Sequence, residues 1–154
     1  MPEVRRLTAS KQRMQMRQET RQFEISTRGT GATDLTAEVL DWVRSTGIRK
    51  GLLTLHVRHT SASLLVQENA DPEVMRDMER FFQRLAPHGD PLFQHTVEGP
   101  DDMSAHVRAA LTQTTLSIPV IDGAPVLGTW QGIFLYEHRT QPHRRLVVCH
   151  LLGE

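Results

Sequence analysis

Three candidate strands follow one another at the end of the chain, and they indicate its fold class. Each is a short apolar stretch bounded by turn residues, and together they cover residues 115–121, 132–137 and 145–152. Strands in direct succession favour antiparallel pairing, whereas a doubly wound parallel sheet alternates its strands with helices. The sequence therefore predicts an α+β fold.

Two segments nearer the N-terminus show the alternation of a half-buried strand. Residues 22–27 alternate polar and apolar side chains, and a turn at residues 28–31 follows them. Residues 51–59 place three apolar side chains on one face and polar ones on the other. The apolar stretch 64–66 is expected to continue the same sheet.

Three helices are predicted between these strands. The first is capped by Asp34 and ends at Gly47. The second begins at Asp71, a capping carboxylate that precedes a proline, and the third begins near Asp102. Their apolar positions are expected to face the core: Leu35, Val39, Trp42 and Val43; Val74, Met78, Phe81, Phe82 and Leu85; and Met103, Val107, Ala110 and Leu111.

The length of 154 residues fits one domain, and no internal repeat or low-complexity linker divides the chain. The first 21 residues carry six basic groups against two acidic ones, although the whole chain has 18 of each. We therefore expect residues 1–17 to form a basic, flexible extension and residues 18–154 to form the domain. The extension has no aromatic residue for base stacking, which favours a solvated segment over one that binds RNA or lipid headgroups.

The chain as a whole gives no indication of nucleic-acid or membrane binding, because its formal net charge is +0. No apolar run approaches the roughly 20 residues that span a bilayer, and the N-terminus lacks the apolar stretch of a secretory signal. Cys149 is the single cysteine, so no intrachain disulfide can form, as in proteins of a reducing compartment. A cytoplasmic location is the resulting expectation.

The densest group of candidate ligands lies in residues 95–106, which contain two imidazoles and three carboxylates. If Asp102 opens a helix, His106 lies one turn later on the same face, and His95 and Glu98 approach from the preceding loop. Imidazole and carboxylate together suit zinc, magnesium, manganese or another divalent cation. The alternative is a polar loop whose acids cap the helix and whose histidines pack against its surface.

Two other segments are candidates for substrate contacts. His59 ends a predicted strand and precedes Thr60 and Ser61, whose hydroxyls can hydrogen-bond a phosphate. Trp130 lies between nearby glycines, so it could stack on a heteroaromatic ring while Gln131 reads the hydrogen-bonding edge of that ring. The alternative is a turn that enters a strand and carries a buried tryptophan.

Five short motifs together carry a family resemblance. They are His59-Thr60-Ser61-Ala62-Ser63; Glu68-Asn69-Ala70-Asp71-Pro72; Asp77-Met78-Glu79-Arg80-Phe81-Phe82; Glu98-Gly99-Pro100-Asp101-Asp102-Met103 with His106; and Gly128-Thr129-Trp130-Gln131-Gly132. In order and spacing they resemble the YjbQ-like secondary thiamine-phosphate synthase family, over residues 18–154. The resemblance implies a compact α+β domain with a β-sandwich-like core of mixed and antiparallel strands, flanked by a few helices. It also implies a homotrimer with its pocket near a subunit interface.

The resemblance further implies a reaction in which hydroxymethylpyrimidine diphosphate joins thiazole phosphate, giving thiamine phosphate and pyrophosphate as a weak, secondary activity. The working hypothesis for this chain is a metal-dependent enzyme acting on a small phosphorylated heteroaromatic substrate. A metal-dependent hydrolase and a non-catalytic metabolite-binding protein are the alternatives. The roles assigned are metal ligation by His59, His95 and His106; catalysis by Asn69, Asp71, Glu98 and Asp102; and substrate binding by Thr60, Ser61, Thr129, Trp130 and Gln131.

Overall fold

The computed structural model describes residues 15–154. Residues 1–14, most of the predicted basic extension, lie outside the described residues. The described elements are β1 (Arg17–Ser26), β2 (Gly31–Asp34), α1 (Thr36–Thr46), β3 (Gly51–Val57), β4 (Ala62–Glu68), α2 (Pro72–Leu85), α3 (Asp102–Leu111), β5 (Thr115–Ile121), β6 (Ala124–Pro125), β7 (Gln131–Glu137) and β8 (Arg144–Gly153).

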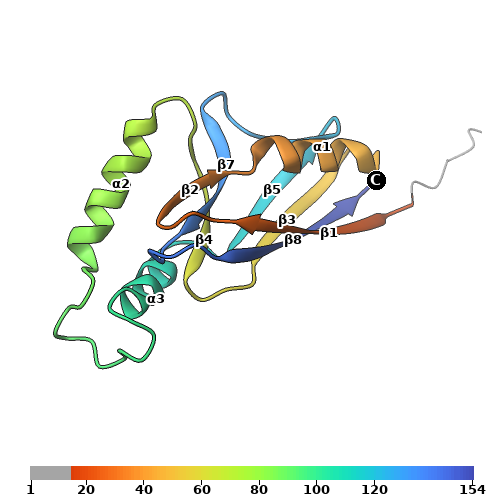
Figure 1. Cartoon of the computed structure of the whole chain (residues 1–154). Helices are drawn as coiled ribbons and strands as arrows, with labels where there is room; N and C mark the ends of the chain where they lie inside the picture. The colour runs from red at the N-terminus through yellow and green to blue at the C-terminus, as the bar shows by residue number, and fades with distance from the viewer. Residues whose placement is uncertain (1–14) are drawn as a thin grey trace, which may run out of the picture.

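The strands form two antiparallel sheets, which confirms the predicted α+β class. One sheet has five strands in the order β1-β8-β3-β5-β6, and the other has three in the order β2-β7-β4. Figure 1 shows α1 packed over the strands, while α2 and α3 lie together at one side of the molecule. None of the helices in residues 15–154 is long and apolar enough to cross a membrane.

The hydrophobic core lies between the two sheets and α1. Leu53 and Leu55 come from the five-stranded sheet, Leu64 and Leu135 from the three-stranded sheet, and Val39 from α1; all five are 0% exposed. Each such side chain contributes about 1.5–3 kcal/mol by leaving water. The alternation predicted for β3 is confirmed, because its alternate apolar residues are the buried ones.

The segment 64–66 is the main correction to the predicted topology. It does not continue the sheet of β3; it lies in β4, which pairs with β7 in the second sheet. β3 ends at Val57, two residues earlier than expected, and the short connection at residues 58–61 carries the chain between the sheets. A short apolar run does not specify which strand it will pair with, so the sequence pattern could not make this distinction.

The start of α1 also differs from the prediction. Gly31, expected in a turn, already pairs with Glu137 as the first residue of β2. Leu35 is the N-cap of α1, although Asp34 Oδ1 accepts a hydrogen bond from the backbone N–H of Thr36 (2.8 Å). The predicted stop is confirmed, because Gly47 is the C-cap with a left-handed φ of 72°.

The apolar stripes of α2 and α3 are not the core faces that the sequence predicts. On α2 only Phe82 is buried, and Phe81 and Leu85 are 50% and 52% exposed. On α3 the buried face carries Ala105 and Ala109, together with Asp102, Ser104 and Arg108, while Leu111 is 59% exposed. Both helices lie beside the sheets and not over the core (Figure 1), so their buried faces are narrow and partly polar.

Candidate functional site

A group of two imidazoles and one carboxylate forms where the loop before α3 meets the first turn of that helix. One ligand atom each from His95, Asp102 and His106 lies within 4.8 Å of the others. His95 Nε2 lies 2.9 Å from Asp102 Oδ2, and His106 Nε2 lies 3.2 Å from the same oxygen. The helical spacing of four residues brings His106 over Asp102, as the sequence predicts.

The orientation of His106 decides which of its nitrogens carries a proton. Its Nδ1 lies 2.9 Å from the carbonyl oxygen of Thr60. A carbonyl oxygen only accepts hydrogen bonds, so Nδ1 carries the proton, and a neutral ring then has its lone pair on Nε2. That lone pair faces the carboxylate oxygen of Asp102, and the contact is favourable only if a proton or a metal ion lies between the two atoms. Metal-ligating histidines commonly donate their other N–H to a backbone carbonyl in this way.

Arg139 holds the second oxygen of Asp102, so that the two oxygens are divided between partners. Arg139 Nη1 donates to Asp102 Oδ1 (2.8 Å), and its Nε donates to Asp101 Oδ2 (3.0 Å). Its Nη2 donates to the backbone carbonyl of Glu98 (2.8 Å). One guanidinium therefore fixes the loop and the start of α3, and leaves Asp102 Oδ2 to the histidines.

The two acidic residues at the start of α3 are buried and remain ionised. Burial by itself would raise the pKa of Asp102, but the hydrogen bond from His95 and the charges of His106 and Arg139 lower the pKa below its usual value. Burial also opposes ionisation of Asp101, yet the hydrogen bonds from Arg139 and Thr140 lower its pKa far below its usual value. Asp102 thus presents a charged carboxylate to the two imidazoles at neutral pH.

A second buried ion pair supports the segment that carries Thr60. Arg145 Nε donates to Glu137 Oε2 (2.7 Å), and Arg145 Nη2 donates to Ser61 Oγ (2.9 Å). Thr27 Oγ1 donates to Glu137 Oε2 as well (2.8 Å). Ser61 is 8% exposed and its hydroxyl is engaged by this network, whereas Thr60 is exposed to solvent.

His59 lies outside the group formed by the other two predicted histidine ligands. Its Nε2 accepts a hydrogen bond from the backbone N–H of Leu146 (2.9 Å), which leaves only Nδ1 for another partner. Burial and the nearby charge of Arg145 lower the pKa of His59. Its assignment as a metal ligand stays a prediction.

The other predicted site residues lie at the far end of the strand pair formed by β4 and β7. Asn69 N–H donates to the carbonyl oxygen of Trp130 (3.0 Å), and Gln131 pairs with Glu68 at the end of the ladder. Asp71 caps α2 by accepting from the backbone N–H of Glu73 (2.9 Å). Trp130 is 65% exposed, so the alternative of a buried tryptophan is wrong. Thr129 is exposed beside it.

Within one chain these two groups of residues are well separated. The histidine group contacts Thr60, which lies two residues before the pair Ala62 and Glu137 at one end of the β4–β7 strand pair. Trp130 directly precedes Gln131, which pairs with Glu68 at the other end; Glu68 lies six residues after Ala62 along β4. At about 3.3 Å per residue, this length of strand spans roughly 20 Å. The chain therefore brings together His95, Asp102, His106 and Thr60, and keeps Asn69, Asp71, Trp130 and Gln131 apart from them.

Sequence reasoning missed the two arginines that organise the histidine end. Arg139 lies in the connection after β7 and Arg145 lies in β8, and nothing in their spacing relates them to residues 95–106. The one available signal was a polar, charged segment, Glu137-His138-Arg139, at the end of an apolar strand. Glu98, a predicted catalytic residue, lies at the rim with its side chain 65% exposed and an oxygen 3.7 Å from Arg139 Nη1.

Comparison with known proteins identifies one family. A family model described as UPF0047 protein YjbQ-like matches residues 21–154. The chain is 48% identical to the UPF0047 protein sll1880 of Synechocystis, over 84% of this chain and 88% of that protein. Among solved structures, it is similar to a YbjQ-like protein of unknown function from Sulfolobus solfataricus (TM-score 0.83, 26% identity, 91% of this chain and 100% of that one). It is also similar to the hypothetical protein APE1520 from Aeropyrum pernix (TM-score 0.80, 34% identity, 88% of this chain and 99% of that one).

Proposed function

The chain belongs to the YjbQ-like UPF0047 family, and we propose that it is a metal-dependent transferase of the thiamine-phosphate synthase type. The names of its relatives carry no activity, so the proposal rests on the site. The observation that carries it is the orientation of His106, whose Nε2 lone pair faces the ionised Asp102 at 3.2 Å. A proton or a metal ion between these two atoms makes the contact favourable, and we propose the metal ion because His95 Nε2 converges on the same oxygen at 2.9 Å.

The residues present suit a divalent ion. His95 Nε2, His106 Nε2 and Asp102 Oδ2 would hold it, as two imidazoles and a carboxylate do in catalytic zinc sites that keep one position open. When bound, the ion supplies positive charge against the negative charge of a departing diphosphate. The hydroxyl of Thr60 is exposed beside the group and can donate to a phosphate oxygen. Glu98, whose side chain is exposed at the rim, would accept a proton in this proposal.

The first test is elemental analysis of the purified protein, compared with His106→Ala, Asp102→Asn and the exposed His88→Ala as a control. We expect near-stoichiometric metal in the parent protein and in the control, and its loss from the two site variants. A His59→Ala variant in the same series decides whether that residue is a ligand. Metal retained in full by His106→Ala would overturn the metal assignment.

The second test is turnover. Diphosphate release from hydroxymethylpyrimidine diphosphate should require both thiazole phosphate and the metal, and should be lost in His106→Ala. Release without thiazole phosphate would favour the hydrolase alternative, which uses the same donor atoms. A rise in melting temperature with these compounds, without any product, would favour a metabolite-binding protein.

We also propose that the protein works as a homotrimer, in which the Trp130 end of one subunit adjoins the histidine group of the next. The support is the separation of roughly 20 Å within one chain, because a small heteroaromatic phosphate cannot reach both ends of β4. Phe81 and Leu85 on α2 offer apolar surface for such contacts.

Mixing two inactive variants tests this shared site. His106→Ala and Trp130→Ala proteins, unfolded and refolded together, form some sites that take the intact half from each. Random assembly should restore about a quarter of the parent activity, since each intact half is present with a probability of about one half. No recovery, or a native mass equal to the 17.5 kDa of one chain, would rule out the shared site.

A further inference from the structure

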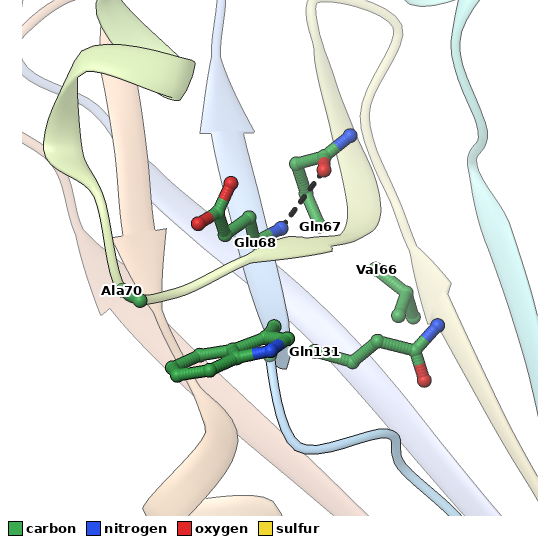
Figure 2. A pocket seen from close by; sticks show the side chains of 6 residues that line it. Val66, Gln67, Glu68, Ala70 and Gln131 are labelled. Carbon is green, nitrogen blue, oxygen red and sulfur yellow. Dashed lines mark hydrogen bonds between the residues drawn. The ribbon is translucent and has the colours of Figure 1, made fainter.

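A pocket outside the histidine group lies beside Trp130. It encloses about 420 Å³ and is lined by Val66, Gln67, Glu68, Ala70, Trp130 and Gln131. That volume is in the range of small-molecule sites. Figure 2 shows that its labelled residues come from the end of β4, the loop after it and the first residue of β7.

The polar groups of this pocket are only partly engaged by the protein. Gln67 Oε1 accepts from the backbone N–H of Glu68 (2.8 Å), the contact marked by the dashed line in Figure 2. Gln131 Oε1 accepts from the backbone N–H of Gly128 (2.7 Å). Each amide is thereby held with its oxygen occupied, and its NH₂ group is left to donate to a ligand.

Charge decides the kind of ligand. The Glu68 carboxylate forms no hydrogen bond or ion pair with any residue in the described range 15–154. Among the described residues that line the pocket, none is basic. Within one chain an anionic group in this pocket would be repelled by Glu68 and would meet no basic lining residue, whereas a cation or an N–H donor would be attracted.

The aromatic surface adds a second preference. Trp130 is 65% exposed, so much of its indole is accessible at the pocket. An indole favours flat rings, and it favours cationic rings most because its face is electron-rich. A hydrogen-bonding carboxylate beside an exposed indole is therefore suited to a planar ring that carries an amino or amidinium group.

We infer that this pocket binds a planar aromatic or heteroaromatic ring bearing an amino or amidinium group, and that Glu68 selects against anions there. In this arrangement the ring stacks on Trp130, its N–H groups donate to Glu68, and its acceptor atoms receive the amide groups of Gln67 and Gln131. Any phosphate on the same ligand must lie outside the pocket. The inference deepens the proposed function, since its biological meaning rests on this ring belonging to the substrate.

Three probes of one shape and different charge test the inference: benzamidine, benzamide and benzoate. Binding is measured by calorimetry on the full chain after treatment with EDTA, so that no metal or turnover is needed. We expect benzamidine to bind best and benzoate not to bind. If the protein holds metal but does not bind benzamidine, only the inference about the pocket is overturned. If the protein holds no metal, the binding measurement is unaffected.

Two variants and a control assign the binding to named residues. Glu68→Gln keeps the shape of the side chain. It should lower the affinity for benzamidine by about tenfold and leave the affinity for benzamide nearly unchanged, because only the charged ligand loses an ion pair. Trp130→Ala should weaken all binding, and Glu38→Gln, an exposed carboxylate on α1, should change nothing. Equal binding of benzoate and benzamidine, or unchanged benzamidine affinity in Glu68→Gln, would overturn the inference.

Discussion

At the scale of the residue, the division of Asp102 between two sets of partners matters most. One oxygen accepts from Arg139 and the other faces His95 and His106. Because each oxygen has its own partners, the direction of this carboxylate is fixed by the protein itself. Partners of this kind, one step removed from the metal, commonly change affinity when they are replaced.

Arg139 therefore provides a prediction about metal affinity. Arg139→Gln should lower the affinity by about tenfold or more, because Asp102 and the loop before α3 lose their shared donor. Arg139→Lys should recover only part of it, since an ammonium cannot donate to Asp101 and Asp102 in the same planar fashion. Competition with a chromophoric chelator measures the affinity.

The control for Arg139 is Arg144→Gln, because the side chain of Arg144 is 80% exposed and its nearest carboxylate oxygen, on Glu24, is 3.9 Å away. The melting temperature of each variant is recorded in parallel to separate misfolding from weak binding. Unchanged affinity in a folded Arg139→Gln protein would show that Asp102 does not need this partner.

At the scale of the element, α2 depends on its N-cap residue, Asp71, more than on its apolar stripe. Asp71 accepts from the backbone N–H of Glu73, and Pro72 occupies the first turn. The stripe itself is half exposed at Phe81 and Leu85. A helix with so narrow a buried face relies more than usual on its cap.

Asp71 was predicted to be catalytic, and its capping role gives a way to separate the two functions. Asp71→Ala should lower the free energy of unfolding by about 1 kcal/mol, whereas Asp71→Asn should be nearly neutral because asparagine caps equally well. Asp77→Ala, which removes an exposed carboxylate from the same helix, is the matched control. Urea unfolding measures the difference. If Asp71→Asn is stable and yet abolishes diphosphate release, the residue has a catalytic role beyond the cap.

The close pairing of β3 and β8 at their glycine ends restricts which residues can occupy these positions. Gly51 and Gly153 are paired across the two strands, and a Cβ on Gly153 would lie 2.2 Å from the backbone oxygen of Lys50. Because that neighbour is backbone, the strands themselves would have to separate. Gly153→Ala should therefore destabilise the protein by about 1–3 kcal/mol.

Gly128→Ala is the control for the Gly153 prediction. Its new Cβ would come no closer than 3.4 Å to the end of the Gln131 side chain, which can move. Thermal unfolding of both variants compares them. An equal loss of stability in the two proteins would mean that the effect comes from the alanine itself and not from the close approach of the β3 and β8 backbones.

At the scale of the whole molecule, the buried His138 links stability to pH. Burial and the charge of Arg108 lower its pKa to about 4, an effect that Glu137 only partly offsets. The unfolded chain binds a proton here near pH 6.5, but the folded chain does so only near pH 4, so stability falls as the pH drops between these values. The loss should reach roughly 3 kcal/mol at pH 4.

His138→Gln should flatten this dependence, measured by urea unfolding of metal-free protein from pH 7 to pH 4. His59 also has a lowered pKa and contributes to the loss of stability over the same pH range. His59→Gln is therefore measured separately to determine that contribution. Glu137, Asp101 and Asp102 have lowered pKa values and lose their contribution to stability only below about pH 5, so the slopes are compared above that pH. An unchanged slope in His138→Gln would show that His138 is not the group that titrates.

The sequence by itself determined most of the local elements and one contact of the candidate site. Alternation located β3 and the second half of β1, and apolar stretches between turns located the three final strands. The cap at Asp71 and the glycine at Gly47 located two helix ends. The spacing of Asp102 and His106 also predicted their contact, because four residues make one helical turn. These features depend on neighbours within a few residues, and such neighbours are visible in the sequence.

Only the tertiary structure decided which distant segments meet. It placed β4 in a second sheet, turned the apolar stripe of α2 toward solvent, and brought Arg139 to Asp102 across 37 residues of chain. It also set Trp130 and His106 at opposite ends of one strand pair, although both belong to the same predicted site. Pairing partners and burial follow from how whole elements pack, and a strand's own pattern of apolar residues is satisfied equally well by more than one partner.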